Sequence, residues 1–196
     1  MSSRLRKLIP VALSVLAVLL LGACGESHTK VTTGTYAGES GQNAPYLDVG
    51  PLIYQVQLSR QLNPANSEDA GYLQGLTPAE QQLKTGEEWF GVFMQVYNTH
   101  EALTFPSTDR ITISDTQGNV YTPLPPPIGN PYAYRPGPVG PSSVVPPADT
   151  TAQFGPTQGA LLLFKIKVVS LDNRPLKVKI IDPNDPTQTA SAVLDV

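Results

Sequence analysis

A proline-rich segment in the middle of the chain limits what this sequence can fold into. Ten of the 25 residues at positions 123–147 are proline, and the whole chain of 196 residues contains 20. Proline fixes φ and has no backbone N–H, so it breaks helix interiors and is confined to the edges of sheets. The composition therefore predicts few long helices and a long loop at 123–147 that lies outside the interior of any sheet.

The segment 88–98 has the strongest strand pattern in the chain. Phe90 and Val92 lie on one face of the predicted strand, and Trp89 and Phe93 lie on the other. Side chains alternate between the two faces of a sheet, so apolar residues on both faces indicate that both faces are covered. The sequence therefore predicts a central strand here.

Alternation of apolar and polar residues predicts the other strands. Within 52–59, we expect one buried face, made of Leu52, Tyr54, Val56 and Leu58. Further strands are predicted at 110–114, 119–122, 160–168, 176–180 and 189–195. Turn-forming residues at 115–118 predict a hairpin between the first two of these, and 170–175 is expected to be a hairpin loop between the next two.

One short helix is predicted between the strands. Thr77 and Glu80 form a capping-box pattern with Pro78 at the first helical position, and Gly86 is expected to stop the helix soon after Lys84. The preceding residues, 62–76, are predicted to be a polar loop. Short strands, turns between them and little helix predict an all-β fold, an antiparallel β-sandwich with one short helix and a long proline-rich loop.

The N-terminal residues differ in character from the rest of the chain. A short basic head with Arg4, Arg6 and Lys7 precedes an apolar run at 8–21. This pattern is typical of a secretory signal peptide. A helix that spans a bilayer needs about 20 apolar residues, so a permanent membrane span is the less favoured alternative.

Leu21, Gly22, Ala23 and Cys24 close this run, and Cys24 is the only cysteine in the chain. These four residues resemble the lipobox of bacterial lipoproteins. The resemblance implies cleavage between Ala23 and Cys24 and a diacylglyceryl group on the sulfur of Cys24, which would anchor the chain to a membrane. The alternative is an ordinary secretory signal that is cut after Ala23 and leaves a free thiol.

These features predict three parts of the chain. Residues 1–23 are a signal peptide that is removed, 24–45 are the lipidated cysteine and a flexible tether, and 46–196 form one β-sandwich domain that contains the proline-rich loop 123–147. A tether rich in Gly, Ser and Thr is expected to behave as a flexible coil. The predicted location is the extracytoplasmic face of the cell membrane.

The order of elements in 45–196 resembles the immunoglobulin-like extracytoplasmic domains of bacterial lipoproteins, particularly actinobacterial ones. The similar features are the aromatic strand that ends in Asn98, the hairpin at 115–118 followed by Tyr121, and the paired strands that end in Asp182 and Pro183. With one cysteine, the antibody-type disulfide cannot form. The resemblance therefore implies an immunoglobulin-like sandwich architecture and assigns no functional residues.

Charge argues against nucleic acid as a partner. The formal net charge is −3, and removal of 1–23 takes away three basic residues and no acidic one, which lowers it to −6. An acidic surface repels phosphate backbones and anionic headgroups.

Patterns that bear on catalysis or metal binding lack their required context. The fragments 27–30 and 84–86 mimic motifs of serine penicillin-recognising enzymes, but Ser27 lies three residues from the lipidation site. With two histidines and no Gly-x-Ser-x-Gly motif, the chain offers no evident base for a serine nucleophile. We therefore expect no enzyme, no metal site and no cofactor apart from the covalent lipid, although Asp182, Asn184 and Asp185 leave calcium binding as an alternative to a simple turn.

The proline-rich loop is the best candidate for specific recognition. Loops of this length are usually functional or disordered, and Tyr132, Tyr134 and Arg135 are residue types favoured at interfaces. We expect a non-enzymatic binding or scaffolding role in the cell envelope, with an envelope protein as partner. Two alternatives remain: the loop is a crossover that covers a sheet edge, or the protein binds a small ligand or a metal.

Overall fold

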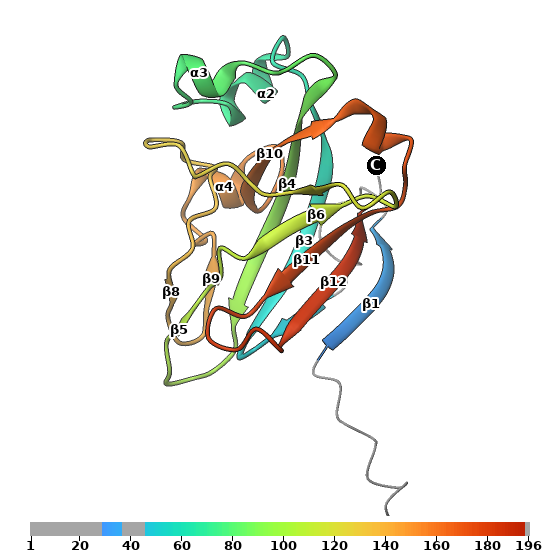
Figure 1. Ribbon diagram of the computed structural model, residues 1–196. Coiled ribbons are helices and arrows are strands. Elements are labelled where there is room, and N and C mark those ends of the chain that lie inside the picture. Colours follow the sequence, from blue (N-terminus) through green and yellow to red (C-terminus); the bar gives the residue numbers. More distant parts are fainter. Residues whose placement is uncertain (1–28, 37–45, 195–196) are drawn as a thin grey trace, which may run out of the picture.

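The computed structural model describes residues 29–36 and 46–194, which form two β-sheets with short helices at their margins (Figure 1). The first sheet has the strand order β1 (Thr29–Tyr36), β12 (Thr189–Leu194), β11 (Leu176–Ile181), β6 (Ile111–Ser114) and β7 (Val120–Tyr121). All neighbouring strands of this sheet are antiparallel except β1 and β12, which are parallel.

The second sheet has the strand order β10 (Ala160–Lys167), β4 (Glu87–Asn98), β3 (Leu52–Leu62) and β2 (Tyr46–Val49), and all of its pairs are antiparallel. Strand β10 pairs with β4 only as far as Met94, and β9 (Ser143–Val145) pairs with the remaining end of β4. A separate two-stranded ladder joins β5 (Phe105–Pro106) to β8 (Pro138–Val139). The prediction of a mostly antiparallel all-β fold is confirmed.

The main core lies between the two sheets and contains buried side chains from both of them. A second apolar cluster lies on the outer face of the second sheet, under the helix α2 (Ser67–Tyr72). Phe90 and Val92 of β4 belong to the main core, whereas Trp89 and Phe93 belong to the second cluster. Strand β4 is therefore covered on both faces, as its sequence predicts.

A β-bulge changes the faces of β3. Val56 lies opposite Met94, but Leu58 lies opposite Phe93, so one extra residue is inserted between them. Such an insertion reverses the alternation of side chains beyond it. The prediction that Leu58 shares a face with Val56 is wrong, because the bulge turns Leu58 outward, where it packs against the second cluster.

The hairpin predicted at 115–118 is confirmed, since β6 and β7 are antiparallel and Gly118 has a φ of 82°. The hairpin predicted at 170–175 is wrong, because β10 belongs to the second sheet and β11 to the first. The 3₁₀ helix η1 (Val168–Leu171) carries the chain from one sheet to the other. The alternation of apolar and polar residues within β10 and β11 would be the same if they formed a hairpin or lay in different sheets, so it cannot distinguish these two arrangements.

The helices differ in extent from the prediction. Thr77 and Glu80 form both hydrogen bonds of the capping box, but α3 (Pro78–Gln81) ends at Gln81, before the predicted end near Lys84. A second helix, α2, occupies part of the predicted loop 62–76 and begins after Asn66, whose side chain accepts from the N–H of Glu68 at 2.9 Å. A third short helix, α4 (Thr151–Phe154), follows the proline-rich segment.

Part of the predicted tether is a strand. Within 24–45, Thr29–Tyr36 forms β1, which pairs with β12, so the prediction of a flexible coil is wrong there. Threonine and valine, which favour strands, make up five of the eight residues of this segment, and its lack of an alternating apolar pattern concealed the strand. The signal peptide, the lipobox and Cys24 lie outside the described residues.

The first part of the proline-rich segment 123–147 runs along the free edge of β10, whereas β8 and β9 in its later part pair with β5 and β4, so the prediction of a loop without strands is wrong there. The N–H of Leu124 donates to the Leu163 carbonyl at 2.8 Å, and the N–H of Tyr134 donates to the Leu161 carbonyl at 2.8 Å. The Leu161 N–H in turn donates to the Tyr132 carbonyl at 2.7 Å. These bonds satisfy the edge of β10, as expected of a crossover that protects a sheet edge.

Gly159, which precedes β10, is a sensitive position for the packing of the second sheet. Its φ is +109°, and a Cβ atom there would lie 2.8 Å from the backbone nitrogen of Met94. We expect Gly159→Ala to lower the free energy of unfolding by about 2–4 kcal/mol, because backbone strain and a clash with β4 add together. Chemical denaturation measures this change.

Gly86→Ala is the matched control. Gly86 also has a positive φ, +78°, but no atom lies within 4 Å of the added Cβ position. It should cost only about 1 kcal/mol, the price of the backbone conformation alone. An equal decrease in the free energy of unfolding in Gly159→Ala and Gly86→Ala would contradict the close contact between Gly159 and β4.

Candidate functional site

A cavity of about 530 Å³ opens between the two sheets beneath the proline-rich segment. We call it the proline groove. It is lined by Asp109, Ile111, Thr122, Pro123, Leu124, Pro125, Pro126, Tyr134, Arg135, Pro136 and Leu162. Its volume falls in the range of about 300–1,000 Å³ that is usual for small-molecule sites. The groove contains two of the three predicted binding residues, Tyr134 and Arg135.

The floor of the groove belongs to the main core. Ile111 comes from β6 of the first sheet, Leu162 comes from β10 of the second, and Tyr134 is 3% exposed. Since the two sheets approach each other here, the floor is apolar and fixed by the packing of both sheets. A ligand in the groove would therefore rest on a preformed apolar surface.

Two buried tyrosines hold the backbone of Thr108 next to the groove. The hydroxyl of Tyr134 donates to the Thr108 carbonyl at 2.9 Å, and the hydroxyl of Tyr54 accepts from the Thr108 N–H at 3.0 Å. Burial raises the pKa of Tyr54 to about 12 and also raises the pKa of Tyr134. Both hydroxyls therefore stay protonated at neutral pH, and their role is to position Thr108 and the adjacent Asp109.

Arg135 holds the outer wall of the groove. Its guanidinium donates to the carbonyls of Pro126 at 3.4 Å, Pro127 at 2.6 Å and Asn130 at 3.5 Å. Proline residues cannot supply N–H donors to order such a segment. The Arg135 side chain supplies them instead, so it stabilises the loop that forms the wall.

The third predicted residue, Tyr132, lies outside the groove. Its ring packs edge-on against Tyr72 with a centroid separation of 4.9 Å, next to the second apolar cluster. The three predicted residues also differ in exposure: Tyr132 is half-buried, Tyr134 is buried and Arg135 is exposed. A protein partner cannot reach the Tyr134 side chain in this fold.

Asn130 is a residue that sequence reasoning missed. It is buried, and its side-chain amide donates to the carbonyls of Tyr72 at 2.9 Å and Gln74 at 3.0 Å. Its side-chain oxygen accepts from the N–H of Tyr132 at 2.9 Å. The first two bonds attach the proline-rich segment to the chain around α2, and the third fixes a turn within the segment. The Gly129–Asn130 pair is a turn signal, which predicts local geometry but not these distant partners.

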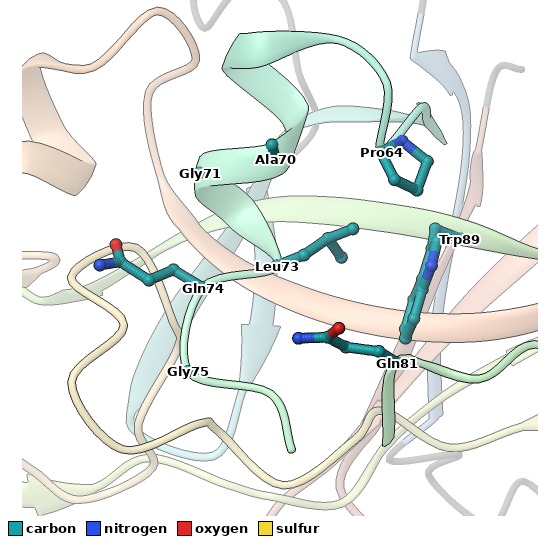
Figure 2. A pocket seen from close by; sticks show the side chains of 8 residues that line it. All are labelled: Pro64, Ala70, Gly71, Leu73, Gln74, Gly75, Gln81 and Trp89. Atoms are coloured by element: carbon teal, nitrogen blue, oxygen red, sulfur yellow. The ribbon is translucent and has the colours of Figure 1, made fainter. Parts of the chain in front are cut away.

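A second cavity of about 430 Å³ lies below α2 and is lined by Pro64, Ala70, Gly71, Leu73, Gln74, Gly75, Gln81 and Trp89. Figure 2 shows the side chains of Leu73, Gln81 and Trp89 pointing toward this space, whereas Gln74 points away. Gln81 donates to the Leu76 carbonyl at 3.1 Å, and Trp89 is only 2% exposed. None of the lining residues is charged, so this cavity offers less chemistry for recognition than the proline groove.

Asp115, Ser170 and Tyr121 form a hydrogen-bonded cluster that joins the β6–β7 hairpin to η1. The Ser170 hydroxyl donates to the Asp115 carboxylate at 2.7 Å and lies 2.6 Å from the Tyr121 hydroxyl. Ser170 is fully buried, so a substrate cannot reach it. The cluster is suited to fixing the connection between the sheets and not to nucleophilic catalysis.

Burial raises the pKa of Asp115, but hydrogen bonds from Ser170, Asn119 and Gln117 outweigh that effect and hold the pKa below its ordinary value. Four of these bonds are 2.7–3.0 Å long. The ionised carboxylate is therefore favoured by the fold.

Asp182 and Asp185 use their carboxylates in the β11–β12 turn. Asp182 accepts from the N–H groups of Asn184 at 2.8 Å and Asp185 at 2.7 Å, and Asp185 accepts from the N–H of Thr187 at 2.9 Å. Within 29–36 and 46–194, no group of three or more His, Cys, Asp or Glu residues is arranged to hold a metal ion. In the same residues, no helix has the length and apolar character needed to cross a bilayer.

Removal of the Asn130 side chain should loosen the proline-rich segment. We expect Asn130→Ala to lower the free energy of unfolding by about 1–3 kcal/mol, because it leaves two carbonyls and one N–H without partners. Amide hydrogen exchange should accelerate in 124–135. Asn184→Ala, in the exposed β11–β12 turn, is the control and should change neither quantity; an equal effect of both variants would contradict the attachment through Asn130.

Asp115 should make stability depend on pH. Its pKa is lower in the fold than in the unfolded chain, so its contribution is present above about pH 4, the ordinary carboxyl value, and is lost as pH falls further. We expect Asp115→Asn to melt at a lower temperature than wild type at pH 7, with the difference shrinking below about pH 4. Thermal melts from pH 7 to pH 2 measure this, and a difference that is constant with pH would contradict it.

No family model and no curated protein matches this sequence. Two solved structures share part of the arrangement. A Bacillus subtilis protein described as a "putative lipoprotein (ycdA)" aligns with 80% of this chain and 39% of its own, at 7% identity and a TM-score of 0.45. A functionally unknown protein from Listeria monocytogenes EGD-e aligns with 80% of this chain and 81% of its own, at 10% identity and a TM-score of 0.45. This chain thus spans about two fifths of the Bacillus protein, and similarity at this level assigns neither family nor function.

Proposed function

We propose that this chain is a lipid-anchored extracytoplasmic protein with an immunoglobulin-like body that binds a small ligand in the proline groove. The anchor is a diacylglyceryl group on Cys24. The observation that supports this anchor is the order of a basic head, a short apolar run and the residues Leu21, Gly22, Ala23 and Cys24. Two acyl chains hold a protein stably on a membrane, whereas one chain does so only marginally.

The binding role is supported by the construction of the proline groove. Its floor is part of the main core, its outer wall is held by Arg135, and the proline-rich segment is attached through Asn130. Preformed concave apolar sites with a few polar groups are typical of ligand-binding proteins. The protein is proposed to act without catalysis, since Ser170 is sealed and His100 accepts from the N–H groups of Ala102 and Leu103 to close a turn.

A second candidate function is recognition of an envelope protein by the outer surface of the proline-rich segment. Ile128 at its tip is 93% exposed, and Phe154 of α4 is 76% exposed. Large exposed apolar side chains occur at protein interfaces when they gather into a patch. Single exposed residues are normal on protein surfaces, so the groove is the stronger basis for a binding role.

Replacement of the proposed lipid acceptor tests the anchor. Cys24→Ser removes the sulfur that would carry the lipid, so we expect the variant to leave the membrane fraction or to accumulate as a larger precursor. Fractionation, gel mobility and intact-mass analysis measure this. Ser27→Ala, three residues away, is the control and should behave like wild type; a Cys24→Ser protein with wild-type mass and location would refute the anchor.

A further inference from the structure

Four prolines bring backbone hydrogen-bond acceptors without N–H donors to the proline groove. Pro123, Pro125, Pro126 and Pro136 line it, and each of them has a backbone carbonyl but no N–H. Within the described part of the chain, no group donates to the carbonyls of Pro123, Pro125 or Pro136. The walls of the groove therefore carry acceptors that a bound molecule can use.

Several donors at the groove are already used, whereas the Thr122 hydroxyl has no hydrogen-bond partner among the described residues. The N–H groups of Leu124 and Tyr134 donate to β10, and the Tyr134 hydroxyl donates to the Thr108 carbonyl. The guanidinium of Arg135 donates to carbonyls of the proline-rich segment itself. An anionic ligand would therefore have to displace one of these bonds to pair with the Arg135 guanidinium, and Thr122 would offer it only a neutral donor.

Asp109 brings a carboxylate to the groove, which also contains the cationic Arg135. It is exposed at the groove, and its carboxylate forms no hydrogen bond or ion pair with any other residue that the structure describes. The backbone on its N-terminal side is fixed, because Tyr54 and Tyr134 both bond to Thr108. A carboxylate on a fixed backbone beside an apolar floor is suited to bind a positively charged group.

The chain itself shows that this segment can bind a cation. Arg135 is an organic cation, and three carbonyls from 126–130 surround its guanidinium. Pro123 and Pro125 bring carbonyls of the same kind to the lining of the groove. The groove thus combines carbonyl acceptors, an unpaired carboxylate and an apolar floor. A matching ligand would carry hydrogen-bond donors, a positive charge and an apolar body.

We propose that the proline groove binds a small organic cation, in which an ammonium or guanidinium group faces Asp109 and an apolar body rests on Ile111 and Leu162. This inference rests on the proposed function and names its ligand class. The apolar body would contact the floor of the groove. The cationic group would pair with the Asp109 carboxylate and donate to proline carbonyls. The net charge of −6 expected after removal of 1–23 favours the approach of cations over anions.

Three probes with the same ring and different charge test this inference: cyclohexylmethylammonium, cyclohexylmethanol and cyclohexanecarboxylate. Titrations use the full-length Cys24→Ser chain, which retains every described residue, and follow NMR chemical shifts of the groove. We expect the ammonium to bind about tenfold more tightly than the alcohol and the carboxylate to bind most weakly, since a charge-assisted bond is gained only by the cation.

Asp109→Asn should reduce the affinity for the ammonium about tenfold, to that of the alcohol, and leave the affinity for the alcohol unchanged. Asp149→Asn removes an exposed carboxylate outside the groove and should change nothing. Thr122→Trp places a large ring in the groove and should lower the affinity for every probe that binds there. Circular dichroism of each variant verifies folding.

The possible failures are distinguishable. Equal binding of alcohol and ammonium, or an unchanged ammonium affinity in Asp109→Asn, would overturn the cation and leave a groove for neutral ligands. Shifts that Thr122→Trp does not reduce would place the binding elsewhere and overturn the inference. Absence of binding by all three probes would overturn the groove as a ligand site, while the anchor on Cys24 would still depend on its own test.

Discussion

Strand β4 is the element on which both apolar clusters depend. Phe90, Val92 and Met94 fill the space between the sheets, and Trp89 and Phe93 fill the space beneath α2. Removal of water from both faces of one strand stabilises two layers at once, because buried apolar area is the main favourable term in folding. In this chain, which can form no disulfide, burial of this kind must supply most of the stability.

The proline-rich segment depends on that framework and completes it. Strand β10 pairs with β4 on one side, and its other edge would be open without the hydrogen bonds to Leu124, Tyr132 and Tyr134. Proline suits this place because the segment must run beside a strand without offering a new edge of its own. The segment bonds to β10 near Leu124 and Tyr134 and pairs with β4 through β9, and its residues 123–126 line the proline groove.

The parts of the fold that follow from local sequence were predictable, and those that depend on distant partners were not. The pattern of β4, the capping box at Thr77 and the hairpin before Asn119 each lie within a few consecutive residues. The bulge at Leu58 and the separation of β10 from β11 depend on which strand lies opposite, which alternation does not encode. Likewise, Tyr134 and Arg135 were selected as residue types, but Asp109 joins them only through the fold.

The parallel pairing of β1 with β12 bears on how the body would withstand mechanical load. Thr29 lies opposite Thr189 and Tyr36 lies opposite Leu194, so the two strands run in the same direction. Under the proposed anchoring, tension from the bilayer enters the body at Thr29 and pulls along the axis of β1. Such a pull shears the slanted bonds of the ladder together, whereas a hairpin pulled at its two ends opens them one by one. The first strand of the body is thus oriented to share a load between the hydrogen bonds on both sides of the irregularity at Val31–Thr35.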